Sequence, residues 1–438
     1  MNGDTLISWG LGLLIALLFL VPYIWNMRRK ERLARSRLSE TRAKGQDQAL
    51  MQHPIINRSV CIGCGICVAA CPEGDVLGLI GGKATIIHGS HCVGHGRCAE
   101  ACPVGGIEVG LGDISQREDI PYLSDHFETN IPGLYIIGEL SGLALIRNAI
   151  HHGVTAVDHI AATRIARASA EWDVVIIGAG PAGLAAALRA REQDLNYLLL
   201  DQDRPGGTIL NYPRKKITLV QKVTLPLYGE LKKYEYSKEE LLAIWEKMIA
   251  KYAINLRTDH KLLGVTSENS VLRVSTSQGE ELARKVILAL GRRGTPRKLG
   301  VPGENSAKVM YKLIDAETYR DCRLLVVGGG DSAVEAAIGL ARQLGNQVTL
   351  SYRKADFFRL KSRNEQNIAK LRAEGGIEVL FNSNLTAIEP DRVRLEQQGR
   401  ILEIDNDYVF IFAGGELPFP LLNSMGIAFG ARVEAAGE

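Results

Sequence analysis

The chain of 438 residues has little net charge, and outside one short stretch it has almost no cysteine. A formal charge of +3 is too small to indicate nucleic-acid binding. Seven of the eight cysteines lie between Cys61 and Cys102, in two clusters that are each followed by proline. This crowding disfavours disulfides spread over a secreted fold and favours metal ligands in a reducing compartment. The length allows about two to four domains of roughly 100 to 200 residues each.

Charged side chains are absent from the apolar stretch Leu6 to Trp25. A helix of this length, at about 1.5 Å per residue, spans a hydrocarbon core of roughly 30 Å. One acid precedes the stretch, whereas residues 27–44 behind it carry eight Lys or Arg against two Glu. The positive-inside rule therefore predicts a single-pass anchor in the cytoplasmic membrane, with the rest of the chain on the cytoplasmic side. A cleaved signal peptide is the alternative, but it would need basic residues ahead of the apolar run.

Two cysteine runs follow the basic stretch. The first, CIGCGICVAACP, has the C-x2-C-x2-C-x3-C-P spacing of bacterial ferredoxins, in which the fourth cysteine ligates the other cluster. The second, CVGHGRCAEACP, repeats this spacing with a histidine in place of its second cysteine. The crossed pattern predicts a first cluster held by Cys61, Cys64, Cys67 and Cys102. It predicts a second cluster held by Cys71, Cys92, Cys98 and, as a candidate fourth ligand, His95.

His95 leaves the type of the second cluster open. Imidazole is neutral where a thiolate is charged, so ligation by His95 would raise the reduction potential of a 4Fe-4S cluster, as in Rieske centres. The alternatives are a 3Fe-4S cluster or an iron without a protein ligand, with His95 merely nearby. His88 and His91 match no ligand position, and we expect both at the surface. The whole module, roughly Pro54 to Val109, resembles a two-cluster ferredoxin, and a disulfide or zinc site there is disfavoured.

From Trp172 onwards the sequence has an α/β pattern: an apolar strand, a glycine-rich turn, a helix and a second strand that ends at Asp201. Gly178, Gly180 and Gly183 permit a tight turn, a close approach of the backbone to a pyrophosphate and close helix packing. Asp201 is placed to accept the hydroxyls of an adenosine ribose. Strand, glycines, helix and acid in this order predict a dinucleotide site.

A second fingerprint follows, with Gly328, Gly330 and Ala333 between an apolar strand and a helix. No acid ends its second strand. Basic residues follow instead and suit the 2′-phosphate of NADP better than the bare hydroxyls of NAD; they are Arg353, Lys354, Arg359 and Lys361. For Lys361 and Arg363 a solvated helix face is the alternative. We therefore expect an NAD(P) site with a preference for NADP.

The assignment of FAD to the first fingerprint rests on a resemblance. The segment FETNIPGLYIIGE, Phe127 to Glu139, resembles the stretch that closes the FAD domain of thioredoxin-reductase-like flavoproteins near their carboxyl terminus. Here it precedes the fingerprint. The family also has counterparts of GG-T at 206–208 and of ALG at 289–291. The resemblance implies a circularly permuted FAD domain, which a fold tolerates when its natural termini lie close together.

The same resemblance implies further flavin contacts. Glu139 stands where the family usually has an aspartate at the ribityl chain, and Arg147, Asn148 and Ala149 would follow near the pyrimidine edge. A structural or solvent role is expected for His151 and His152. Beyond the fingerprint, the implied FAD-binding residues are Gly138, Glu139, Asn148, Gly207, Thr208 and Gly291.

Thioredoxin reductases carry a CxxC dithiol just before the second fingerprint, whereas this chain has only Cys322 there. One thiol cannot form an internal disulfide, so the chain is more similar to the ferredoxin–NADP reductase branch of the family. No catalytic acid or base is predicted, because a flavin itself converts between hydride transfer and single-electron transfer.

These features predict an α/β protein with two Rossmann-like three-layer domains, the FAD domain permuted, behind a small α+β dicluster ferredoxin module and a transmembrane helix. The predicted order is anchor 1–50, ferredoxin 51–112, permuted FAD part 113–165, FAD domain 171–297, NAD(P) domain 298–412 and a return to the FAD domain at 413–438. We expect a membrane-anchored oxidoreductase that passes electrons between NAD(P)H, FAD, two iron–sulfur clusters and a membrane or ferredoxin-like partner. The resemblance leaves a homodimer open. The alternatives are a small-molecule disulfide reductase, resembling bacillithiol reductases, and a redox sensor.

Overall fold

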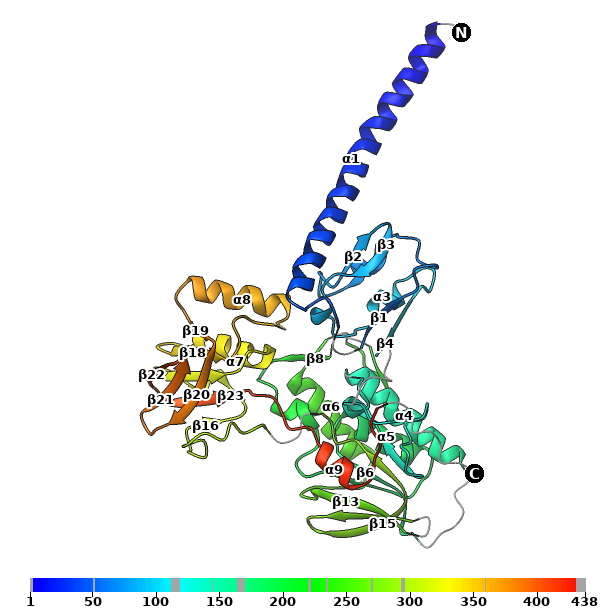
Figure 1. Ribbon diagram of the computed structural model, residues 1–438. Coiled ribbons are helices and arrows are strands. Elements are labelled where there is room, and N and C mark those ends of the chain that lie inside the picture. The colour runs from blue at the N-terminus through cyan, green and yellow to red at the C-terminus, as the bar shows by residue number, and fades with distance from the viewer. Residues whose placement is uncertain are drawn as a thin grey trace. The chain divides into compact units, whose positions relative to one another are not determined.

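The computed structural model describes most of the chain, namely residues 3–49, 52–111, 119–143, 145–163, 170–219, 222–233, 235–268, 271–292, 296–358 and 360–430. The chain folds as two compact units (Figure 1). The first unit comprises residues 1–112 and the second unit residues 113–438.

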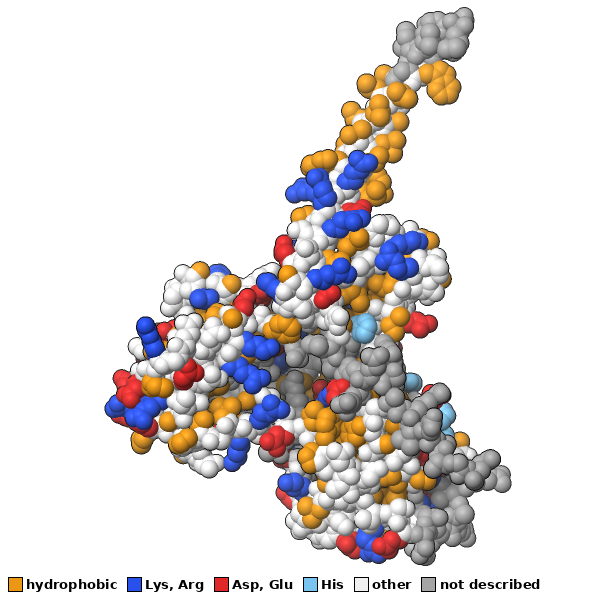
Figure 2. Space-filling model, in the orientation of Figure 1, with side chains coloured by type: hydrophobic (Ala, Val, Ile, Leu, Met, Phe, Trp, Pro, Cys, Tyr) orange, Lys and Arg blue, Asp and Glu red, His pale blue; other side chains and the backbone are white. Residues whose placement is uncertain are grey.

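The first unit begins with the long helix α1, Gly3–Ala43. Of the helices that the structure describes, it alone is long and apolar enough to cross a membrane. Its apolar side chains, such as Leu13 and Phe19, are exposed rather than packed in a core. Figure 2 shows them along the outer part of the helix, with basic side chains further along. The last turns instead pack on the unit, where Ala34 and Thr41 are buried.

The rest of the first unit is a small α+β module. Two antiparallel strand pairs form it, β1 (His53–Ile56) with β4 (Ile107–Gly110) and β2 (Leu77–Ile80) with β3 (Lys83–Ile86). Short helical segments lie in or next to the cysteine runs: α2 (Ile66–Ala70) contains Cys67, η1 (Gly89–His91) directly precedes Cys92, and α3 (Arg97–Glu100) contains Cys98. The buried residues of its apolar cluster are Cys67, Val76, Leu77, Ala84, Cys98 and Ile107. Two of these six are predicted ligands, so the core of the module is small.

A seven-stranded sheet, here called the first sheet, dominates one part of the second unit. Its strand order is β12 (Leu256–Arg257), β7 (Tyr197–Leu200), β6 (Trp172–Ile177), β15 (Gly279–Leu288), β14 (Val271–Thr276) and β13 (Leu262–Glu268), with β5 (Leu134–Ile136) also paired to β15. The strands β12, β7, β6, β15 and β5 run parallel, and β13 to β15 form an antiparallel meander.

The first sheet lies between two apolar layers, because successive strand residues point to opposite faces. Val174 and Ile176 belong to the core on the helical face, and Val175 and Ile177 to the core on the other face. The helices whose residues join the first of these cores are α4 (Ile146–Ala162), α5 (Pro181–Glu192) and α6 (Lys238–Lys251). The meander and the short helix α9 (Phe419–Ser424) form the other layer.

The segment ahead of the first fingerprint is part of this first sheet. Strand β5 pairs in parallel with β15, and α4 packs along α5. A Cβ atom on Gly153 of α4 would collide with the backbone of α5 at Ala182. The end of the described chain returns to the same place, because Phe429 bridges Pro121 and the Tyr122 N–H donates to Ala428 O over 2.9 Å.

The second sheet of this unit is parallel and five-stranded, in the order β16 (Val309–Met310), β23 (Tyr408–Ile411), β17 (Arg323–Val327), β18 (Gln347–Tyr352) and β19 (Glu378–Phe381). Helices cover one face, namely α7 (Asp331–Ala341) and α8 (Ser362–Ala373). A three-stranded meander covers the other, formed by β20 (Ser383–Ile388), β21 (Arg392–Gln397) and β22 (Arg400–Asp405). The two sheets confirm the predicted mixed α/β architecture.

Short elements complete the second unit. They are η3 (Gly138–Ser141), η4 (Gly207–Asn211), β8 (Ile217–Leu219), β9 (Thr224–Leu225), β10 (Gly229–Glu230), β11 (Tyr236–Ser237) and η5 (Ala316–Thr318).

Candidate iron–sulfur and nucleotide-binding sites

Four of the predicted cysteine ligands line one pocket of the first unit, here called the first pocket. The first cysteine run, in the loop after β1 and in α2, supplies three of them and the end of the second cysteine run the fourth, namely Cys61, Cys64, Cys67 and Cys102. Gly63 and Gly65 have φ values of +73° and +75°, which glycine adopts without strain. A Cβ atom on Gly63 would also collide with Gly82 O at the tip of the β2–β3 hairpin. The loop thus needs glycine to curve around the pocket.

A second pocket is lined by the remaining predicted ligands, Cys71, Cys92, His95 and Cys98. The His95 Nε2 atom lies 3.9 Å from Glu73 Oε1, and Glu73 also lines this pocket. The structure therefore brings together the two groups of side chains that the crossed pattern predicts. Each group contains a residue from the other cysteine run.

All eight cysteines are free thiols, and several in the pockets are desolvated. Burial raises the pKa of the Cys67, Cys71 and Cys92 thiols, and it raises that of Cys98 to about 11. The Cys61 thiol differs, because the Ala84 N–H donates to its sulfur and lowers its pKa. Thiols that resist ionisation this strongly need a bound cation to become thiolates, so these pockets fit iron–sulfur clusters better than reactive nucleophiles.

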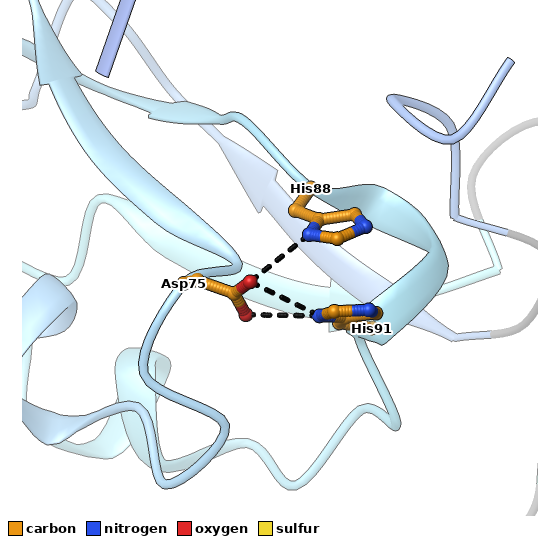
Figure 3. A group of neighbouring side chains, drawn as sticks. All are labelled: Asp75, His88 and His91. Carbon is orange, nitrogen blue, oxygen red and sulfur yellow. Dashed lines mark hydrogen bonds and ion pairs between the residues drawn. The ribbon is translucent and has the colours of Figure 1, made fainter. Parts of the chain in front are cut away.

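Asp75, His88 and His91 form a separate cluster in the first unit (Figure 3). The His88 Nδ1 atom lies 3.0 Å from Asp75 Oδ2, and His91 Nδ1 lies 3.0 Å from Asp75 Oδ1. Burial alone would raise the pKa of the Asp75 carboxyl, but these hydrogen bonds outweigh it and hold the pKa well below its usual range. Only 5% of His91 is exposed. The expectation that both histidines lie at the surface was wrong, because it ignored the carboxylate that they share.

The two imidazole rings lie close together, with their planes tilted by 31° to each other. Their centroids are 3.4 Å apart, whereas two imidazoles that bind one ion at about 2 Å point away from each other and stand about 5 Å apart. The arrangement is thus that of a hydrogen-bonded clamp. It ties the segment ahead of β2 to η1, just before Cys92.

The first glycine turn of the second unit lies at the carboxyl ends of β6 and β15. Gly178 has a φ of +106°, and a Cβ atom there would collide with Ala289 O. A Cβ atom on Gly183 would collide with Gly178 O. Gly180 is the N-cap of α5, and a Cβ atom on it would meet nothing nearer than Gly207 Cα at 3.8 Å. The turn leaves room above the helix N-terminus, which favours a phosphate.

Asp201 follows β7 and is 9% exposed. Its Oδ2 atom accepts a hydrogen bond from the Ala179 N–H over 2.5 Å, so the acid is anchored to the glycine turn. Burial raises the pKa of this carboxyl. Thr208 belongs to η4, which starts at Gly207 beside Gly180, and Gly291 follows β15 with a φ of +68°.

The residues of the displaced segment lie at the same edge of the sheet. Gly138 has a φ of +77°, and a Cβ atom on it would be 3.1 Å from Ala182 Cβ. Glu139 follows in η3, and Asn148 stands in the first turn of α4. The structure thus brings Gly138 next to the fingerprint helix, although the two are separated in the sequence.

The two histidines of α4 have opposite surroundings. His151 is exposed, and His152 is 2% exposed, with its Nδ1 atom 3.2 Å from Ser141 Oγ and its ring 4.2 Å from that of Phe127. Burial, with a smaller contribution from His151, lowers the pKa of His152 to about 4. His152 is therefore a neutral packing residue near neutral pH.

The second glycine turn lies at the carboxyl end of β17. Gly328 has a φ of +141°, and a Cβ atom there would be 2.6 Å from Phe412 O and 3.0 Å from Ala333 Cβ. Gly330 is the N-cap of α7, and a Cβ atom on it would meet nothing within 4 Å. Ala333 is buried in α7.

Of the predicted phosphate-binding residues, Arg353 and Lys354 follow β18 and are exposed, with Lys354 Nζ 4.7 Å from the centre of the Phe358 ring. Arg359 lies outside the described residues. The Lys361 N–H donates to Asp331 Oδ1 at the start of α7. Sequence reasoning did not single out Tyr352 as a site residue, yet its ring lies directly over Gly329. The sequence signal that could have identified Tyr352 is its position as the last residue of β18, the second strand of this fingerprint.

Comparison with known proteins agrees with this geometry. Residues 175–432 match the family described as pyridine nucleotide-disulphide oxidoreductase, and residues 53–103 match a 4Fe-4S dicluster domain. A ferredoxin–NADP reductase of Thermus thermophilus is 31% identical over 55% of this chain and 72% of its own length. A thioredoxin reductase of Mycolicibacterium smegmatis is 32% identical over 55% and 75%.

The alignments cover parts of both partners. For the ferredoxin–NADP reductase of Ignicoccus hospitalis, 29% identical, this chain spans 64% of the relative's length. Among solved structures, the bacillithiol disulfide reductase of Staphylococcus aureus has a TM-score of 0.53 at 26% identity, over 59% of this chain and 80% of that one. With two glycine turns of this geometry and a match over more than half its length, the chain belongs to the pyridine nucleotide-disulphide oxidoreductase family, as an NAD(P)H-dependent flavoprotein oxidoreductase that also carries a 4Fe-4S ferredoxin domain.

Proposed function

We propose that this protein is a membrane-anchored oxidoreductase that passes electrons between NADPH, FAD and two iron–sulfur clusters, to or from a membrane-side or ferredoxin-like partner. The observation that carries the proposal is the pair of thiol pockets on the same chain as two nucleotide-binding folds. Bound FAD would supply the conversion between two-electron hydride transfer and single-electron transfer. Reduction of a disulfide by a flavin does not require such pockets.

The residues of the second unit bind and orient the two nucleotides in this proposal. The turn of Gly178 to Gly183 would receive the FAD pyrophosphate at the N-terminus of α5, and Asp201 the adenosine ribose. The turn of Gly328 to Ala333 would receive NADPH in the same way, with Arg353 and Lys354 at its 2′-phosphate. No side chain of this set has to donate or accept a proton.

The FAD domain is, in this proposal, circularly permuted. The support is that β5 and α4 complete the first sheet although they precede its first fingerprint strand. The described end of the chain also lies beside residues 120–122, since the Gly430 N–H donates to Ile120 O over 3.2 Å. A short hairpin between these two places would restore the order of an unpermuted relative.

The second pocket would hold a cluster with His95 as its fourth ligand. The support is that His95 lines this pocket with three cysteines and that no fourth cysteine does. Replacing His95 by Ala is expected to change the electron paramagnetic resonance signal of one cluster only. An unchanged spectrum would remove His95 from the ligand set, and His95→Cys, which restores the full cysteine motif, is the matched control.

Anchoring by α1, with the rest of the chain in the cytoplasm, is supported by its exposed apolar stretch and by the basic residues behind it. A second candidate function is the reduction of a small disulfide, which the similarity to bacillithiol disulfide reductases favours. The dicluster domain disfavours it, because that chemistry needs no clusters. A redox sensor would show slow turnover with every acceptor.

The test of the proposed function is an anaerobic titration of the purified protein with NADPH and, separately, with NADH. Flavin bleaching is followed optically and the clusters by electron paramagnetic resonance. Reduction of flavin and clusters by NADPH below one equivalent is the expected result. A flavin that neither NADPH nor NADH bleaches would refute electron transfer from the nicotinamide through the flavin to the clusters. Turnover of disulfides without cluster reduction would favour the second candidate.

A further inference from the structure

Helix α1 runs without interruption from the apolar stretch into the packed part of the first unit. The contacts of α1 with the module therefore fix the distance of each part of the module from the apolar stretch. Glu31 Oε1 accepts a hydrogen bond from the Gly81 N–H over 2.9 Å. Ten residues further on, Thr41 Oγ1 donates to Ile87 O over 2.6 Å. The tip of the β2–β3 hairpin therefore points along α1 toward the apolar stretch, and its base points away.

Helical rise converts these contacts into distances from the apolar stretch, which ends at Trp25. Glu31 lies about 9 Å and Thr41 about 24 Å beyond Trp25 along the helix axis. The polar headgroup layer is about 5 to 8 Å thick on each side of a bilayer. If Leu6 to Trp25 span the hydrocarbon core, the hairpin tip stands at the outer edge of the headgroups and the hairpin base stands in solvent.

The two thiol pockets lie at opposite ends of this hairpin. At the tip, Gly63 meets Gly82, and the Ala84 N–H donates to Cys61 Sγ over 3.5 Å, which places the first pocket there. Val76 and Leu77, at the base, line the second pocket. Strand β2 separates the two ends by about 10 Å. The first pocket is therefore nearer to the apolar stretch of α1.

The chain leaves the module at the other end. Val109 of β4 lines the second pocket, β4 ends at Gly110, and the second unit begins at residue 113. The chain from α1 also enters the module at this end, because Pro54 lines the second pocket opposite Val109. The first pocket is thus near the apolar stretch through the contact of the hairpin tip with α1, and not through the chain connection.

The surface around the first pocket is apolar. Cys64 is exposed, and Ile62 is 63% exposed. The other exposed apolar side chains of this rim are Val60, Ile66 and Val104. Lys83 and Arg58 lie beside it, with Lys83 Nζ 2.5 Å from Cys61 O. Exposed apolar side chains with basic neighbours are typical of a surface that rests on a membrane.

We propose that the first pocket is the membrane-side electron-exchange site, that its apolar rim rests against the outer edge of the headgroup layer, and that its partner is a lipid-soluble carrier of the quinone class. This rests on the proposed function. The first pocket would hold, through its four cysteines, a cluster that supplies one electron at a time, so the carrier would take two electrons in succession and two protons from solvent. With NADPH as reductant the balance is NADPH + H⁺ + quinone → NADP⁺ + quinol.

The first test measures depth. The holoprotein is inserted into phosphatidylcholine vesicles with Gd³⁺-chelating headgroups and reduced with dithionite, so that NADPH is not needed. Cys64→Ser and Cys92→Ser, one for each pocket, assign the two resonance signals. We expect the relaxation of the first-pocket cluster to be enhanced about fivefold more than that of the other, given about 10 Å of separation. Equal enhancement, or a stronger effect on the second cluster, overturns the proposal.

A matched pair of variants tests the packing that sets this depth. Ala34 is 6% exposed and faces Gly78, whereas the neighbouring Leu33 is 56% exposed. Ala34→Trp must displace the hairpin, so we expect the difference between the two clusters to shrink at least twofold. Leu33→Trp should leave the difference as it is. If both variants behave alike, the helix contact does not position the module.

The carrier is tested separately with Ile66→Asp, which puts a charge on the rim outside the pocket lining. The ratio of electron transfer to a quinone in vesicles over transfer to ferricyanide in solution should fall about fivefold. An unchanged ratio, or an equal loss with a soluble ferredoxin, assigns the rim to another partner and refutes the proposal. Vesicle flotation distinguishes these outcomes from a failure of anchoring, which would overturn both proposals at once.

Discussion

The two glycine turns of the second unit are built alike and surrounded differently. In each, the first glycine has a positive φ and abuts a carbonyl oxygen of the neighbouring strand, Ala289 O beside Gly178 and Phe412 O beside Gly328. In the first turn a buried acid, Asp201, is bonded to the turn itself. In the second turn the equivalent strand leads into Tyr352, whose ring covers Gly329, and then into exposed basic residues.

We interpret this difference as that between a site for a tightly bound cofactor and a site for a nucleotide that exchanges in every turnover. A buried acid and a closely packed helix suit a cofactor that remains bound through many turnovers. Basic side chains in solvent suit a substrate that binds and leaves, because exposed contacts cost little to make and break. The comparison can be tested at matched positions of the two turns.

The largest effect is expected at Gly183, the third glycine of the first turn. Its substitution by Val would drive a side chain into Gly178 O, and backbone cannot yield as a flexible side chain can. We expect a loss of more than about 3 kcal/mol of stability, with loss of FAD. Flavin content after purification and the melting temperature measure this. Gly264→Val in strand β13, where a Cβ atom meets nothing within 4 Å, is the control, and an equal loss there would contradict the packing argument.

The second effect compares Gly180 with Gly330, the N-caps of the two fingerprint helices. Neither has close neighbours, so Leu at either position should fold but fill the space of a pyrophosphate. Gly330→Leu should keep the flavin spectrum and lose reduction by NADPH, whereas Gly180→Leu should lose the flavin. Absorbance spectra and stopped-flow bleaching distinguish the two. If Gly330→Leu is still reduced at the normal rate, NADPH does not bind at this turn.

The third prediction concerns the choice of nicotinamide. Replacing Arg353 and Lys354 by Ala should lower the preference for NADPH over NADH about tenfold, the effect of about one charge-assisted hydrogen bond, without a change in flavin content. The ratio of kcat/KM for the two nucleotides measures it. Arg363→Ala, on the exposed face of α8, should leave this ratio unchanged. A ratio that moves with Arg363 instead would place the 2′-phosphate elsewhere.

Much of this architecture could be predicted from local signals. Strand, glycine and helix patterns locate both turns, because a turn such as that at Gly178 tolerates no other residue type. Cysteine spacing also predicted which side chains the two pockets bring together, since the three short intervals of each run leave the chain few ways to curve. In both cases most of the residues that form the site are close to one another in the sequence.

What sequence reasoning missed depends on contacts between distant segments. Asp75 is one acid among many until β2 and η1 fold together and bring His88 and His91 to it. The burial of His152 likewise depends on Phe127 and Ser141, which no periodicity connects to α4. The packing of Ala34 on the β2–β3 hairpin has no signal in the composition of α1. These contacts could be recognised only once the fold was known.

The smallest expected effect is a difference between the two sheets in how their stability depends on pH. Residues 298–412 contain no histidine, whereas the first sheet buries His152, whose pKa burial lowers to about 4. The unfolded chain binds a proton there below about pH 6.5 and the folded chain does not, so stability falls as the pH decreases from 6.5 toward 4. Between pH 7.5 and 5.5 we expect a loss of about 1.4 kcal/mol, confined to the first sheet. His152→Phe should remove most of this loss, since burial also lowers the pKa of His159 in the same helix, and His151→Gln, on the exposed face, should keep most of it, as urea unfolding with hydrogen exchange can measure. A pH dependence that survives undiminished in His152→Phe would assign the acid sensitivity to another group.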